Sequence, residues 1–204
     1  MVRSMSILKY TILAFFLLSL ISCATPKQEF QTFEVGVVPI IINNGGDELT
    51  PEFMNKLDVS LLIAKLEIEK DVKVVLNFDE PLLVNEVMEM ACPFEYPELK
   101  LNSQYKRNIL LFINVPNECT NLLGCSGLES IKDTDPIPVL ITAEDDQVAT
   151  AMVLIHEMGH VLGAEHLNDM HIMTAAQQFT LFLDYSQKSL DQIWKVLSPL
   201  YKDK

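Results

Sequence analysis

Basic residues are scarce in this chain, which has 15 lysines and arginines against 28 aspartates and glutamates. They form no run anywhere, and the formal net charge at pH 7 is −13. Because proteins bind phosphate backbones through basic patches, nucleic acid is not expected as a partner. Internal repeats and low-complexity stretches are also absent. The hydrophobic fraction of 49% is typical of a globular domain and excludes a disordered chain.

The longest hydrophobic run, Thr11 to Ile21, is too short to span a bilayer comfortably. Two basic residues precede it and small residues follow it, which is the layout of a secretory signal peptide. Its end, Leu20-Ile21-Ser22-Cys23, resembles the lipobox of bacterial lipoproteins. The resemblance implies cleavage before Cys23, acylation of its thiol and anchoring to the bacterial cell envelope. Ala24 implies the outer membrane if the cell is Gram-negative. The alternative is a plain signal peptide with a chance cysteine.

Three further cysteines, Cys92, Cys119 and Cys125, follow Cys23 in the chain. An exported location permits a disulfide, and the odd number leaves one thiol free or paired between chains. Three pairings are open, of which the short loop favours Cys119–Cys125. We expect a signal peptide at 1–22, the acylated cysteine and a short tether at 23–31, and one domain at 32–204.

Apolar runs and helical patterns alternate along that domain and predict an α/β or α+β fold. Thr50 followed by Pro51 is typical of a helix start. The near-continuous apolar run at 108–115 suits a strand buried on both faces, and prolines at 136 and 138 favour a sheet edge for 137–142. The expected strands are 32–42, 72–78, 108–115 and 137–142. The expected helices run from Thr50 to about Leu66, from the acidic residues 144–146 to Leu162, and from Ser186 to near Pro199.

Histidine is also rare, and three of the four histidines lie in the stretch HEMGHVLGAEH, residues 156–166. His156 and His160 are four residues apart on a predicted helix, so their rings project from one face. Gly163 lets the chain leave the helix sharply, so that His166 can return toward the same point. Three imidazole nitrogens leave one zinc position open for water, as in catalytic sites. Glu157 could then act as the general base.

The full pattern HExxHxxGxxH resembles that of the metzincin metalloproteases. The segment His171-Ile172-Met173-Thr174 resembles their Met-turn, in which Met173 would be structural, and His171 has no assigned role. The closing stretch SLDQIWKVLSPLY is loosely similar to the last helix of the matrixin branch. The resemblance implies a twisted mixed sheet with an antiparallel edge strand, an active-site helix and a C-terminal helix. It also implies that strand 137–142, with Val139, Leu140 and Ile141, binds an extended peptide by strand addition.

We therefore expect a membrane-anchored zinc endopeptidase with one catalytic Zn²⁺ held by His156, His160 and His166. Its substrate would be a peptide or protein, the lipid at Cys23 would anchor it to the membrane, and the protein would be a monomer. One alternative is a zinc-binding surface lipoprotein that has lost turnover, although zinc binding alone does not need Glu157. The other is a lipoprotein that carries the motif by chance and binds no metal.

Overall fold

The computed structural model describes residues 32–43, 49–84, 108–114, 124–126, 131, 136–169, 171–174 and 183–202. The chain divides into the units Met1–Gln31 and Thr32–Lys204, and every described residue belongs to the second. The predicted signal peptide and tether, with Cys23, lie outside the described residues. Among the residues that are described, no helix combines the length and apolarity needed to cross a membrane.

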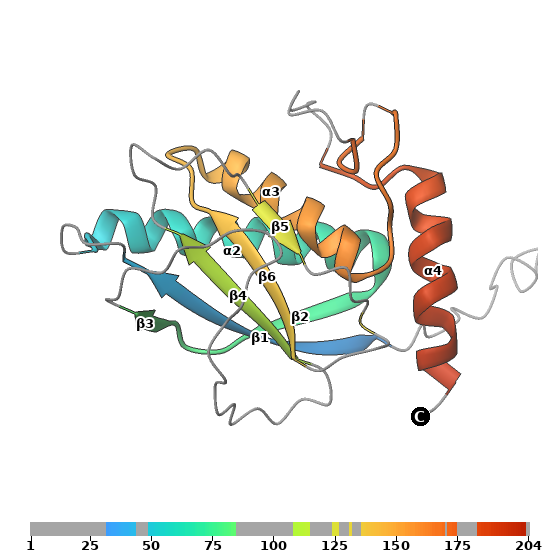
Figure 1. Ribbon diagram of the computed structural model, residues 1–204, viewed down its shortest axis with the longest axis horizontal. Coiled ribbons are helices and arrows are strands. Elements are labelled where there is room, and N and C mark those ends of the chain that lie inside the picture. The colour runs from blue at the N-terminus through green and yellow to red at the C-terminus, as the bar shows by residue number, and fades with distance from the viewer. Residues whose placement is uncertain are drawn as a thin grey trace, which may run out of the picture. The chain divides into compact units, whose positions relative to one another are not determined.

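A six-stranded mixed sheet forms the centre of the domain (Figure 1). Its strand order is β2-β1-β4-β6-β5, and β3 pairs with the far end of β1. In the part of the chain that the structure describes, every pairing is parallel except that of β5 with β6, which is antiparallel. The predicted α/β class with an antiparallel edge strand is therefore confirmed. The strands are β1 (Phe33–Ile42), β2 (Val74–Phe78), β3 (Leu82–Val84), β4 (Asn108–Asn114), β5 (Gly124–Ser126) and β6 (Ile137–Thr142).

The apolar run in β4 is buried on both faces, as expected. Side chains alternate between the two faces of a strand, so odd and even positions enter different environments. Ile109, Leu111 and Ile113 belong to the main core cluster. Leu110 and Phe112 belong to a second cluster on the other face. Because both faces of this strand are buried, its sequence is a nearly continuous hydrophobic run.

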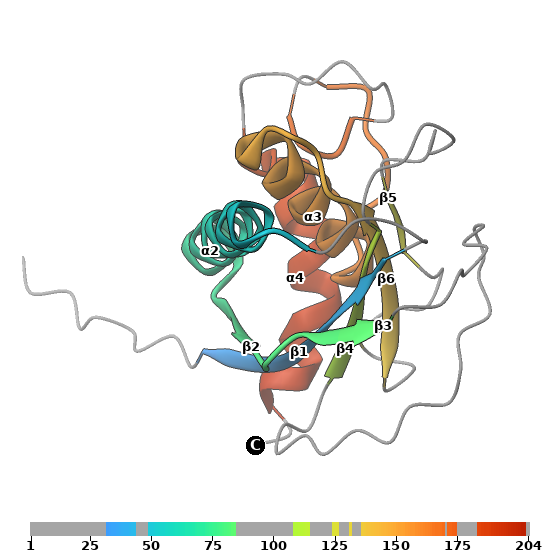
Figure 2. The ribbon, with the colours of Figure 1, turned by 90° about the vertical axis from the view of Figure 1, so that its left-hand side faces the viewer.

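Helices α2 (Pro51–Val72) and α3 (Gln147–Val161) cover one face of the sheet (Figure 2). Thr50 caps α2 as expected, because its hydroxyl accepts a hydrogen bond from the Phe53 N–H at 3.1 Å. The helix ends at Val72, so the predicted end near Leu66 is wrong. Its buried stripe continues through Ile68 to Val72, which keeps the last turns packed on the sheet.

The residues expected at the starts of the other two helices also lie there in the structure. The Asp146 carboxylate caps α3 by accepting hydrogen bonds from the next amides, and Gly163 follows the helix with a φ of 100°. Ser186 precedes α4 (Gln187–Lys202), and its hydroxyl accepts a hydrogen bond from the Ser189 N–H. The predicted end near Pro199 is wrong, since α4 continues to Lys202. A proline in the last turn removes only one helical hydrogen bond, and the residues after it still pack on the core.

Strand β6 lies inside the sheet, between β4 and β5. Val139, Leu140 and Ile141 pair with β5 on one side and with β4 on the other. Their predicted role as the edge strand that binds substrate is therefore wrong. The ladder with β5 needs no amide from Pro138, so a proline near the start of the strand is compatible with an interior position.

The outermost strand next to β6 is β5, whose sequence Gly-Cys-Ser has no β-branched residue to predict it. Cys125 in this strand forms a disulfide. All other cysteines lie outside the described residues, so the pairing Cys119–Cys125 stays a prediction.

Candidate metal centre

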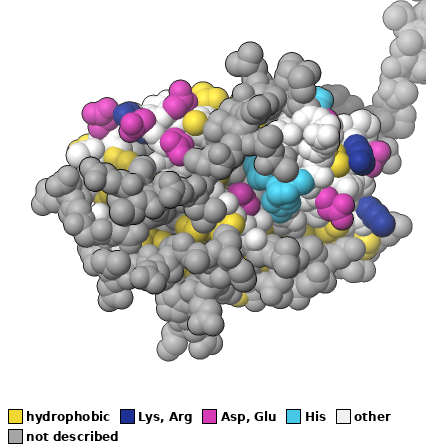
Figure 3. All heavy atoms as spheres, turned by 45° about the horizontal axis from the view of Figure 1, so that its top comes forward, with side chains coloured by type: hydrophobic (Ala, Val, Ile, Leu, Met, Phe, Trp, Pro, Cys, Tyr) yellow, Lys and Arg dark blue, Asp and Glu magenta, His cyan; other side chains and the backbone are white. Residues whose placement is uncertain are grey.

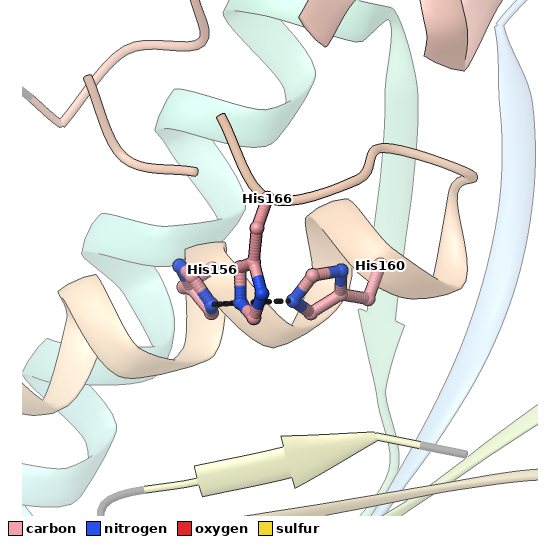
Figure 4. Close-up of side chains that lie close together, drawn as sticks. All are labelled: His156, His160 and His166. Carbon is pink, nitrogen blue, oxygen red and sulfur yellow. Dashed lines mark hydrogen bonds between the residues drawn. The ribbon is translucent and has the colours of Figure 1, made fainter. Parts of the chain in front are cut away.

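Three histidines converge at the end of α3 (Figure 4). Nε2 of His166 lies 3.2 Å from Nε2 of His156 and 3.1 Å from Nε2 of His160. One ligand atom from each ring lies within 4.8 Å of the other two, and the three residues could hold a metal ion. The structure therefore brings together the three side chains that the motif selected.

The third histidine returns because the chain turns sharply after α3. Gly163 adopts a φ of 100°, which side chains with a Cβ rarely allow. Its N–H donates to the His160 carbonyl at 2.9 Å, and the Ala164 N–H donates to the Gly159 carbonyl at 2.8 Å. A Cβ at Gly163 would also lie only 2.3 Å from Cγ2 of Val196 on α4. Both the backbone conformation and the close approach of α4 require glycine here.

Backbone carbonyls fix the orientation of the two helical histidines. Nδ1 of His156 lies 2.7 Å from the Ile172 carbonyl oxygen, and Nδ1 of His160 lies 2.9 Å from the Ala164 carbonyl oxygen. A carbonyl only accepts, so each Nδ1 carries the proton and each Nε2 presents a lone pair toward the centre. Burial lowers the pKa of His156, and it lowers the pKa of His160 to about 4. Both rings are therefore neutral near pH 7, which is the form that binds metal.

The spacing of the three rings would allow them to hold one metal ion. In a tetrahedral site with Zn–N bonds of about 2.0–2.1 Å, two ligand nitrogens lie about 3.3 Å apart. The two measured Nε2–Nε2 distances, 3.2 and 3.1 Å, are close to that value. Only three protein ligands converge among the described residues. Figure 3 shows histidine side chains gathered at the surface of one face, so a small molecule can reach them.

Glu157 follows the first ligand on α3 and is 6% exposed. Burial raises the pKa of its carboxyl to about 7, while a hydrogen bond with the Ser126 side chain lowers it. The edge strand lies directly against this residue, because a Cβ built on Gly124 would be 2.9 Å from Oε1 of Glu157. Gly124 and Ser126 alternate with Cys125, so both face α3. Neither residue was selected from the sequence, since a contact between β5 and α3 leaves no local signal.

Met173 is fully buried beneath α3. A Cβ on Gly159 would lie 2.3 Å from its sulfur atom, so the glycine between the two helical ligands makes room for the methionine. The Met173 carbonyl accepts a hydrogen bond from the Leu167 N–H at 2.9 Å, which connects the turn at Met173 to the residue after His166. Tyr185, which the sequence did not single out, supports α3 from below through a 2.6 Å hydrogen bond to the Ile155 carbonyl.

The fourth histidine stands apart from this cluster. Nδ1 of His171 lies 3.3 Å from the carboxylate of Asp184, and the residue is not a member of the metal-binding group. In comparisons with known proteins, no family model matches the sequence and no curated protein matches it significantly. The site is consequently defined by its own geometry: a cluster of His156, His160 and His166 that could bind a metal ion, in an α/β domain.

Proposed function

We propose that this protein is a zinc-dependent endopeptidase, anchored to the bacterial cell envelope by a lipid on Cys23. The observation that carries the proposal is the convergence of three imidazole nitrogens at α3, which also carries a buried glutamate. The full metzincin pattern, with a buried methionine under the helix, supports the same activity. So does the mixed sheet with its antiparallel edge strand, which is the architecture that the resemblance implies.

His156, His160 and His166 would hold the ion and leave one position open to solvent. A zinc ion in such a site supplies Lewis-acid activation of water and of a carbonyl group. Glu157 would take the proton of the attacking water and pass it to the leaving amine. A carboxylate at this position could serve in both transfers, because it can accept a proton and then release it.

The substrate would be a peptide or protein in extended conformation. Among the described residues β5 is the outermost strand of the sheet beyond β6, and it contacts the helix that carries Glu157. Addition of a peptide strand along β5 would bring a main-chain carbonyl near the histidines, with hydrogen bonds as in other strand-addition complexes. The binding strand in this proposal is β5 and not β6.

The test is cleavage of a broad peptide library by the soluble part of the chain, residues 24–204, with and without a chelator. We expect cleavage that stops with the chelator and returns with stoichiometric zinc. The control is His160→Ala, which removes one ligand. If the fully metallated wild-type protein cleaves no peptide, the endopeptidase proposal is wrong. The alternative, a zinc-binding lipoprotein without turnover, then takes its place. If the protein binds no zinc, the histidine motif is a chance pattern.

A further inference from the structure

The third ligand is held differently from the other two. His156 and His160 lie on α3, and each donates its Nδ1 proton to a backbone carbonyl. His166 lies in the loop after the helix and is exposed. Among the described residues its Nδ1 has no hydrogen-bond partner, so its ring is not oriented through that atom. The position of His166 therefore depends on how its backbone is held.

Two backbone amides, one on each side of His166, fix the loop. On the C-terminal side the Leu167 N–H donates to the Met173 carbonyl at 2.9 Å. On the N-terminal side the Glu165 N–H donates to Oε1 of Gln192 at 3.1 Å. Gln192 lies on α4, far along the chain from the loop. The ligand is thus held between the Met173 turn and the C-terminal helix.

Helix α4 also touches the start of the same loop. Gly163 packs so closely on Val196 that a Cβ at Gly163 would lie 2.3 Å from Cγ2 of the valine. Gln192 and Val196 are four residues apart and therefore lie on one face of α4. That face contacts the loop at two points, Gly163 and Glu165, which precede the ligand.

The helix is itself firmly placed, which lets it act as a support. Ile193 and Leu197 are fully buried in the main core cluster. Near its end, Tyr201 packs against Phe33 of β1 with ring centroids 5.8 Å apart. A side chain on such a helix offers a fixed acceptor to the loop, because a displacement of α4 would disturb the core.

We propose that Gln192 is a positioning residue of the metal centre, whose side-chain carbonyl holds the Glu165 amide and thereby places His166 for metal binding. The proposal rests on the metal site of the proposed function and not on peptide cleavage. Groups that orient metal ligands from outside the coordination shell influence affinity in many metalloproteins. One neutral hydrogen bond of this kind changes an equilibrium by about two- to tenfold.

The test compares two substitutions at one position. Gln192→Met keeps the length of the side chain and removes the acceptor, whereas Gln192→Glu keeps an acceptor oxygen. Gln187→Met is the matched control, since Gln187 is exposed on the same helix and bonds only Asp191 at 2.9 Å among the described residues. Zinc affinity is measured by competition with a chelator, and the visible spectrum of the cobalt-substituted protein reports ligand geometry.

We expect Gln192→Met to bind zinc about two- to tenfold more weakly than wild type, with an altered cobalt spectrum. Gln192→Glu and Gln187→Met should bind zinc at least as tightly as wild type does. The thermal midpoint of the metal-free Gln192→Met protein should match that of the Gln187→Met control, because the effect lies in ligand placement. Unchanged affinity and an unchanged spectrum for Gln192→Met would overturn the proposal.

The outcome separates this proposal from the proposed function. If the wild-type protein binds zinc but cleaves no peptide, the endopeptidase proposal fails and the affinity comparison still decides the role of Gln192. If wild type binds zinc and Gln192→Met binds it equally well, only the positioning role fails. If wild type binds no zinc at all, both proposals fail.

Discussion

Glu157 should make the metal-free protein less stable as pH rises, and Glu157→Gln should remove that loss. The carboxyl is 6% exposed, and burial raises its pKa from an ordinary 4.5 to about 7. A pKa raised in the folded state means that the folded protein holds this proton more tightly than the unfolded chain. Its contribution to stability is therefore fully present below about pH 4.5 and is lost as pH rises to about 7. A glutamine does not titrate, so the variant keeps its stability across that window.

The size of the effect follows from the same values. Each pKa unit corresponds to about 1.4 kcal/mol, so the rise from 4.5 to about 7 gives an upper limit of about 3 kcal/mol at pH 8. The Ser126 hydroxyl, which hydrogen-bonds the carboxyl, can also bond a glutamine amide in the same place. We therefore expect Glu157→Gln to exceed wild type by up to about 3 kcal/mol at pH 8 and to equal it near pH 4.

The assay is denaturant unfolding of both proteins in excess chelator at several pH values from about 4 to 8. Glu34→Gln is the matched control, because Glu34 is exposed on β1 and the same substitution there removes no buried charge. With zinc added, the gap at pH 8 should shrink, since a nearby cation favours the charged carboxylate. Equal stabilities at pH 8 without zinc, or a gap that closes as pH rises, would refute the reasoning.

Three further predictions concern the ligands, the packing under α3 and the anchor. His160→Ala should lose stoichiometric zinc on dialysis, because two imidazoles remain; elemental analysis that finds one equivalent at normal affinity would remove His160 from the ligand set. Gly159→Ala should destabilise the protein by about 1–3 kcal/mol in denaturant unfolding. Its new methyl group would lie 2.3 Å from the Met173 sulfur and 2.9 Å from the Tyr185 ring, so an unchanged midpoint would contradict this packing. Cys23→Ser should release the protein from membranes or leave it unprocessed, and fractionation that shows it still anchored and cleaved would contradict lipidation.

The features that were predicted correctly are those that depend on near neighbours in the chain. The spacing of His156 and His160 places both rings on one helical face, and Gly163 provides the turn that returns His166. The caps at Thr50 and Asp146 are equally local, since each side chain bonds amides two or three residues ahead. Local geometry alone was therefore enough to select the candidate ligands and to place the helix that carries them.

The features that were missed depend on contacts between distant segments. Strand β5 has only three residues, and it exists because it pairs with β6. Without it, β6 seemed to be the edge of the sheet, and Val139 to Ile141 were assigned to substrate. The hydrogen bond from the Glu165 amide to Gln192 joins a loop to a helix across 27 positions of the sequence. A contact between segments so far apart leaves no periodic pattern in the sequence that could predict it.

The central claim, that Glu157 is the base of a zinc-dependent peptidase, is tested most directly by kcat/KM of zinc-loaded wild type and Glu157→Gln on one good peptide substrate. Zinc content must be measured in parallel, because the glutamine variant should keep its metal and its peptide affinity. General-base assistance contributes about 10²–10⁴-fold, so the variant should cleave at least about a hundredfold more slowly. A zinc-loaded glutamine variant that cleaves nearly as fast as wild type would contradict the claim.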